Sequence, residues 1–136
     1  NDFEASRIDS YLDANLVFAR EAQVYLLEIE HLTKEGHSRM TSTYEFYLSG
    51  IETSLSRNKF IVSDCLSIAD ISYVCDFAQF LREGHYLETI TQKGFELISD
   101  NLSQEYPLAL KHLLDLSEYE EFSSVMGSYL NWYKRN

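Results

Sequence analysis

Proline, glycine and cysteine are all scarce in this chain of 136 residues, which contains one Pro, five Gly and two Cys. So few turn-forming residues leave little room for an all-β fold, which needs a turn after each short strand. The two cysteines, Cys65 and Cys75, are too few for a disulfide framework. Both flank the start of a predicted buried helix, so we expect them to pack as small hydrophobic side chains in a reduced, cytosolic protein.

Positively charged residues are also few. Eleven Lys and Arg stand against 22 Asp and Glu, and the formal net charge is −11. An acidic surface repels phosphate backbones and anionic lipid, so the composition argues against nucleic-acid and membrane binding. No apolar run approaches about 18 residues, so no membrane span is predicted, and no signal peptide is recognisable.

Several chemical signatures are missing as well. The four histidines are not spaced as metal ligands, with one another or with a cysteine, so no metal site is predicted. The sequence has no glycine-rich phosphate loop, and neither cysteine has an obvious base beside it, so no catalytic residue is assigned within the chain. The chain does have the material for a core, because 45% of its residues are hydrophobic and 14% are aromatic.

The most informative stretch is Phe60–Ile71, which reads FIVSDCLSIADI. An apolar run ends at the turn-forming pair Ser63-Asp64, and Ser67 and Asp70 then have the three-residue spacing of a helix capping box. We expect Ser67 Oγ to accept a hydrogen bond from the N–H of Asp70, and the Asp70 carboxylate to accept one from the N–H of Ser67. The pattern predicts a strongly capped helix start.

The helix that follows this cap is predicted to run to about Glu83, with Gly84 as a left-handed residue at its end. Leu66 and Ile71 have the spacing of a hydrophobic staple at its start. Its residues are apolar almost all round, which predicts a central, buried helix. Asp76 is an exception, and we expect it at an edge of the helix.

A long helix is predicted over residues 3–32, with two apolar stripes. The stripes consist of Ile8, Leu12, Leu16, Ala19, Gln23 and Leu26, and of Tyr11, Phe18, Tyr25 and Leu32. Both stripes belong to one wide core face, or one of them meets another domain, a partner subunit or a ligand.

Other helices are predicted from the same periodicity. After a break at Thr33–Ser38, one covers residues 39–57, in which Gly50 would allow close packing. Another starts at Pro107, because proline suits the first helical turn. The last begins with the capping-box spacing of Ser117 and Glu120. Its apolar residues are Phe122, Val125, Met126, Tyr129, Leu130 and Tyr133.

The apolar run, the Ser-Asp turn and the S-I-A-D-I sequence at 67–71 resemble the start of the sixth helix of glutathione transferases. Tyr106-Pro107-Leu108 is similar to a second helix start of that family, whereas its usual Gly-Asp turn is Ser63-Asp64 here. The resemblance covers most of the chain. It implies an all-α bundle of five to six helices in which residues 1–136 form a single domain, the C-terminal domain of such a protein.

The resemblance also implies that a second domain binds glutathione. In that family an N-terminal thioredoxin-like domain holds glutathione and activates its thiol, and no segment of this chain matches it. We therefore expect that domain as a partner preceding Asn1, glutathione as co-substrate, no other cofactor, and no conjugating activity from this chain alone. The family also implies a cytoplasmic homodimer with a role in detoxification.

The C-terminal domain of the family lines the pocket for a small apolar electrophile. The matching positions on the first helix are Tyr11, Asn15, Phe18 and Ala22. These side chains either line that pocket or fill an interface with a domain or subunit.

Two functional hypotheses follow. In the first, the chain is the substrate-pocket domain of a glutathione transferase, in which the glutathione thiolate attacks an electrophilic carbon. In the alternative, it is a non-catalytic interaction module with the same fold, resembling domains of translation-factor subunits and synthetase assemblies. A thioredoxin-like domain with a cis-proline before Asn1 would favour the enzyme.

Overall fold

The computed structural model describes residues 1–124 and Leu130, and this part of the chain is helical, without any strand. The α-helices are α1 (Asp2–Leu27), α2 (Lys34–Leu55), α3 (Ile68–Phe80), α4 (Leu87–Gln92), α5 (Leu102–Glu105) and α6 (Pro107–Ser117). Two 3₁₀ helices, η1 (Ile29–His31) and η2 (Leu81–Tyr86), follow α1 and α3, and residues 120–124 are also helical. The predicted all-α class is therefore confirmed.

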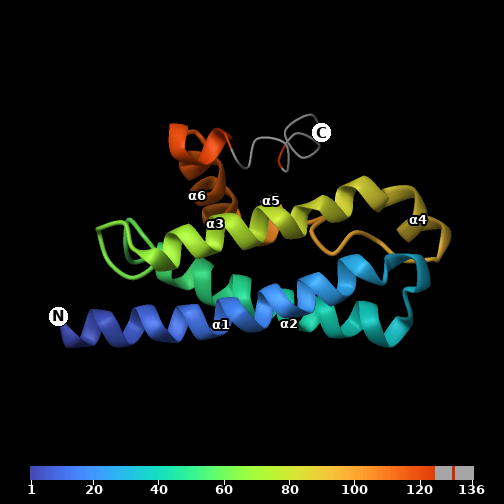
Figure 1. The fold of residues 1–136 in the computed structure, drawn as a ribbon, viewed down its shortest axis with the longest axis horizontal. Coiled ribbons are helices and arrows are strands. Elements are labelled where there is room, and N and C mark those ends of the chain that lie inside the picture. The colour runs from blue at the N-terminus through green and yellow to red at the C-terminus, as the bar shows by residue number, and fades with distance from the viewer. Residues whose placement is uncertain (125–129, 131–136) are drawn as a thin grey trace.

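Three long helices form the body of the fold (Figure 1). α1 and α3 run in the same direction, α2 runs in the opposite direction, and α6 is steeply inclined to all three. α1 packs against α2 and α3, while α6 packs against α2 and α3 from the other side. The core between them is aromatic, because Phe18 of α1 stacks on Tyr47 of α2 with ring centroids 4.8 Å apart and meets Phe80 of α3 at 5.5 Å.

The two stripes of α1 lie in different surroundings. Phe18 and Tyr25, from the seven-residue stripe, are buried, whereas Leu16 of the other stripe is 51% exposed. One wide core face therefore does not cover both stripes in this chain. The helix also ends at Leu27, before the predicted residue 32, because the chain tightens into η1, which buries Ile29.

The predicted break at Thr33–Ser38 is wrong. Thr33 has an extended backbone, and its Oγ1 accepts a hydrogen bond from the N–H of Gly36 at 3.0 Å, so it is the N-cap of α2. Gly36 thus belongs to the first turn of a helix that begins at Lys34. The second prediction for this helix also fails, because a Cβ at Gly50 would meet nothing within 4 Å and no close packing requires a glycine there.

The end predicted for the third helix is also wrong. α3 ends at Phe80 and continues as η2, and Gly84 lies buried inside η2. Among the described residues, positive φ occurs at Gly94 alone, with φ 87°. The chain remains helical past Phe80 as η2. Glu83 of η2 is buried, and it accepts hydrogen bonds from residues 98 and 99.

α6 starts as predicted, with Pro107 in its first turn, but its first N–H groups are capped from another helix. The Glu52 carboxylate of α2 accepts from the N–H of Leu108 at 2.9 Å and from that of Ala109 at 2.8 Å. A carboxylate at this position also compensates the positive end of the helix dipole.

The capping box predicted at Ser117 is wrong. Ser117 is the last residue of α6, and its hydroxyl donates to the carbonyl of Leu114 at 2.7 Å. Of the apolar residues predicted for the last helix, Leu130 is buried and Phe122 is partly buried. Val125, Met126, Tyr129 and Tyr133 lie outside the described residues.

Candidate functional site

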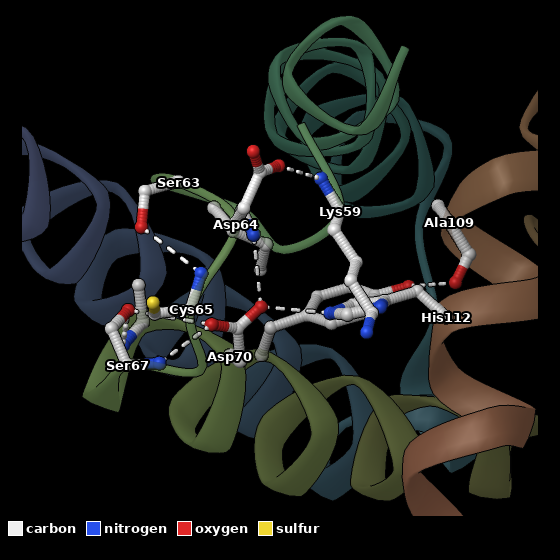
Figure 2. A network of polar contacts seen from close by, with 11 residues as sticks. Lys59, Ser63, Asp64, Cys65, Ser67, Asp70, Ala109 and His112 are labelled. Carbon is white, nitrogen blue, oxygen red and sulfur yellow. Dashed lines mark hydrogen bonds and ion pairs between the residues drawn. The ribbon is translucent and has the colours of Figure 1, made fainter. Parts of the chain in front are cut away.

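The start of α3 is held by a buried carboxylate (Figure 2). Asp70 has no exposed surface, and its Oδ2 accepts from the N–H of Ser67 at 2.9 Å. Its Oδ1 accepts from the N–H of Ile61 at 2.9 Å and from Nε2 of His112 at 2.8 Å. The capping box predicted for Ser67 and Asp70 is confirmed, and Ser67 Oγ also accepts from the N–H of Ala69 at 3.2 Å.

This carboxylate joins three parts of the chain. Ile61 belongs to the loop between α2 and α3, Ser67 is the N-cap of α3, and His112 lies in the middle of α6. Tyr73, one turn after Asp70, donates to the carbonyl of Ala109 in α6 at 2.6 Å. Asp70 and Tyr73 thus fix α6 against α3, which is more than a helix cap alone would do.

The side chains around this cap are more exposed than predicted. Leu66 and Ile71 are both exposed, so the predicted hydrophobic staple is not part of the core. Cys65 and Cys75 are exposed too, which contradicts the prediction that both cysteines are buried. Local spacing identifies the cap, but it does not show which face of α3 the neighbouring helices leave open.

The four predicted substrate-binding residues do not share one surface. Phe18 has no exposed surface and Ala22 is buried, so both belong to the core of this chain, and none of the described pockets includes them. Asn15 is also buried. Tyr11 alone of the four lines a groove, and its hydroxyl contacts the hydroxyl of Ser54.

Asn15 links the three long helices through its amide. Its Nδ2 donates to Asp76 Oδ2 of α3 at 2.5 Å, and its Oδ1 accepts from the hydroxyl of Tyr47 in α2 at 2.7 Å. Burial raises the pKa of the Tyr47 hydroxyl, and the nearby Asp76 carboxylate adds to this. Tyr47 therefore stays protonated and acts as a donor at neutral pH.

A groove with a volume of about 780 Å³ lies between α1 and α2. Tyr11 and Ala14 line it from α1, and Gly50 lines it from α2. Arg7 and Arg57 also line it. Sequence reasoning missed both arginines, because they are 50 positions apart and only the pairing of two antiparallel helices brings them together. We call this feature the α1–α2 groove.

Exposed apolar side chains also lie on the solvent sides of α1 and α3. Leu16 of α1 is 51% exposed and Ile68 of α3 is 55% exposed. We define the α1–α3 face by residues with helical spacing on each helix: Leu12, Leu16, Ala19, Ile68, Ile71 and Cys75. The bond between Asn15 and Asp76 joins the two helices that carry these residues.

A second buried carboxylate lies near the far end of α3. Glu83 accepts from the N–H and the hydroxyl of Ser99, at 2.8 and 2.7 Å, and from the hydroxyl of Tyr25 at 2.8 Å. Burial raises the pKa of Glu83, although these hydrogen bonds act in the opposite direction. Glu83 fixes the chain before α5 against α1, and none of the described pockets includes it.

No group of three or more His, Cys, Asp or Glu among the described residues is arranged to hold a metal ion. None of the helices in the same residues has the length and apolar character needed to cross a membrane. Comparisons of the chain with models of protein families, with curated proteins and with solved structures found no match.

Proposed function

We propose that this chain is the C-terminal domain of a glutathione-transferase-like enzyme that conjugates glutathione to a small apolar electrophile. In such a reaction the sulfur of glutathione bonds to an electrophilic carbon, the leaving group departs with its electron pair, and the thiol proton passes to solvent. Holding both reactants in one site supplies the proximity, and a lowered thiol pKa supplies the nucleophile.

The observation that carries the proposal is the open α1–α3 face. Leu16 and Ile68 are both more than half exposed on it, next to a helix start whose sequence resembles that family. Covering apolar surface is favourable by about 25 cal/mol per Å². A preceding thioredoxin-like domain packed on this face would bury it and would bring its bound glutathione beside α1.

The proposal changes which residues of α1 reach the electrophile. Phe18 and Ala22 are buried in the core of this chain. Leu16 and Gln23 are exposed on the flank of α1 toward α3. These two residues, rather than Phe18 and Ala22, would border a substrate held between the two domains.

The test uses adjacent residues of α1 with similar exposure. Leu16 lies on the α1–α3 face, whereas Val17, 57% exposed, points about 100° away around the helix. In the complete protein, we expect turnover of glutathione with chlorodinitrobenzene, at least a tenfold loss in Leu16→Asp, and less than a twofold change in Val17→Asp. Melting of both variants of residues 1–136 shows whether the domain itself stays folded.

Two outcomes would contradict the proposal. The first is a folded complete protein that does not conjugate glutathione to this electrophile, which would favour the non-catalytic interaction module. The second is turnover that Leu16→Asp and Val17→Asp lower equally, because the α1–α3 face would then have no special part in joining the domains.

A further inference from the structure

A pocket with a volume of about 360 Å³ lies where α1 ends, η1 follows and α2 begins, and we call it the turn pocket. It shares no lining residue with the α1–α2 groove. Tyr25 and Met40 line the turn pocket and are buried, so they form its floor, whereas Val24 at its edge is 52% exposed. Leu32 adds a further apolar side chain. The volume lies at the lower end of the range for ligand pockets, roughly 300–1,000 Å³, so the pocket has room for an apolar side chain of a partner.

The charged rim of the turn pocket is acidic. Glu21, Glu28 and Glu35 line it, together with His31 and Arg39. The Arg39 guanidinium donates to both carboxylate oxygens of Glu21, at 2.8 and 2.7 Å, so these two charges neutralise each other. Within residues 1–124, neither Glu28 nor Glu35 forms an ion pair. Two carboxylates of the rim therefore remain for cations from outside the chain.

The position of Glu28 adds an unfavourable interaction that a bound cation would relieve. Glu28 is the C-cap of α1, whose last turn has no basic residue, and Glu30 follows in η1. The C-terminal end of a helix carries partial negative charge, so carboxylates are disfavoured there and cations are favoured. Lys34 is the nearest Lys or Arg along the chain, and it does not line the turn pocket. Negative side chains are thus gathered at the negative end of α1, next to an apolar pocket.

We propose that the turn pocket docks a basic segment of a partner protein. An apolar side chain of the segment enters the pocket against Val24 and Met40, and a Lys or Arg on either side of it pairs with Glu28 and with Glu35. The net charge of −11 attracts such a segment before contact is made. The inference does not rest on the proposed conjugation reaction, because the turn pocket includes no residue of the α1–α3 face.

The test compares three short peptides by titration calorimetry with the complete protein. The first alternates pairs of leucine with pairs of lysine, the second has glutamate in place of lysine, and the third has serine in place of leucine. We expect one leucine–lysine peptide per chain, with Kd raised at least tenfold by the double variant Glu28→Gln, Glu35→Gln and at least threefold by Val24→Ser. The glutamate peptide should not bind, and the serine peptide should bind at least threefold more weakly than the first.

The controls separate a specific site from general effects of charge and folding. Asp9→Asn, Asp13→Asn removes the same charge from exposed positions of α1 outside the turn pocket and should change Kd less than twofold. Val17→Ser is the control for Val24→Ser, because Val17 is 57% exposed on the same helix and does not line the pocket. Thermal melting of each variant distinguishes lost binding from lost folding.

Two results would overturn the proposal. The first is an equal rise in Kd for the two double variants, which would mean that the peptide responds to the overall charge of the protein alone. The second is equal binding of the leucine–lysine and serine peptides, because no apolar side chain would then enter the turn pocket.

Discussion

Removing the Asp70 carboxylate should unfold this domain far more readily than removing any exposed carboxylate. Asp70 is fully buried and accepts from the N–H groups of Ile61 and Ser67 and from the His112 ring. Loss of a helix cap costs about 1 kcal/mol, and each buried donor left without an acceptor costs about 1–3 kcal/mol. We expect Asp70→Ala to lower the free energy of unfolding by about 3–5 kcal/mol, the range found when a buried charged pair loses one partner.

Asp64→Ala is the matched control, because Asp64 is exposed and accepts one hydrogen bond, from the N–H of Lys59 at 2.9 Å. Its loss should cost no more than about 1 kcal/mol. Urea and thermal unfolding followed by circular dichroism measure both changes, and the Asp70→Ala melting temperature should fall by about 10–20 °C. Equal shifts for the two variants would refute the view that Asp70 anchors the loop, α3 and α6 together.

Two further perturbations test the backbone and the second buried carboxylate. Gly50→Ala should stabilise the chain by about 1 kcal/mol, because alanine is the better helix former and its Cβ meets no other atom. Gly94→Ala should lower the free energy of unfolding by about 1–2 kcal/mol, because the backbone at this position has φ 87°. Urea unfolding that ranks the two variants the other way would contradict this. Glu83→Gln should lower the free energy of unfolding by about 1–3 kcal/mol, because an amide cannot replace the four hydrogen bonds that the carboxylate accepts. Burial raises the pKa of Glu83 in the folded chain. The difference in the free energy of unfolding between wild type and Glu83→Gln should therefore be full below the unfolded pKa of about 4.3 and decline as pH rises through the folded-state pKa. A difference that grows with pH would show a pKa shift in the opposite direction.

Local spacing predicts the features of this fold that depend on neighbouring residues. Ser67 and Asp70 are three positions apart, so their capping interaction depends only on residues within one turn of the helix. Pro107 marks the start of α6 for a similar reason, because its fixed φ suits a first helical turn. The helical class follows from the periodicity of the apolar residues and from the scarcity of Pro and Gly.

Contacts between distant segments could not be predicted in this way. Glu52 caps a helix 56 positions later in the chain, and Glu83 bonds Ser99, which lies beyond α4. Thr33 was misread because Gly36 suggested a break, although a glycine is tolerated in the first turn behind a good cap.

The candidate sites were predicted less well than the fold. A stripe of apolar residues on α1 shows that a face is buried, but Phe18 and Leu16 are equally apolar, and only the positions of α2 and α3 decide which one is covered. Arg7 and Arg57 become neighbours in one groove only through the register of α1 and α2. The buried Asn15 and its partner Asp76 also require that register, although an amide inside an apolar stripe was the one signal available.

The reactivity of Cys75 tests most directly whether another domain covers the α1–α3 face. Cys75 is exposed on that face in the isolated chain, so iodoacetamide should reach its thiol, and burial and the nearby Asp76 carboxylate raise the pKa of the thiol and make the reaction slower than that of a free cysteine. In the complete protein, mass spectrometry should show the alkylation of Cys75 slowed at least tenfold, and Leu16→Asp should restore the faster rate. An unchanged rate of Cys75 alkylation in the complete protein would mean that the face stays open, and the proposed domain arrangement would be wrong.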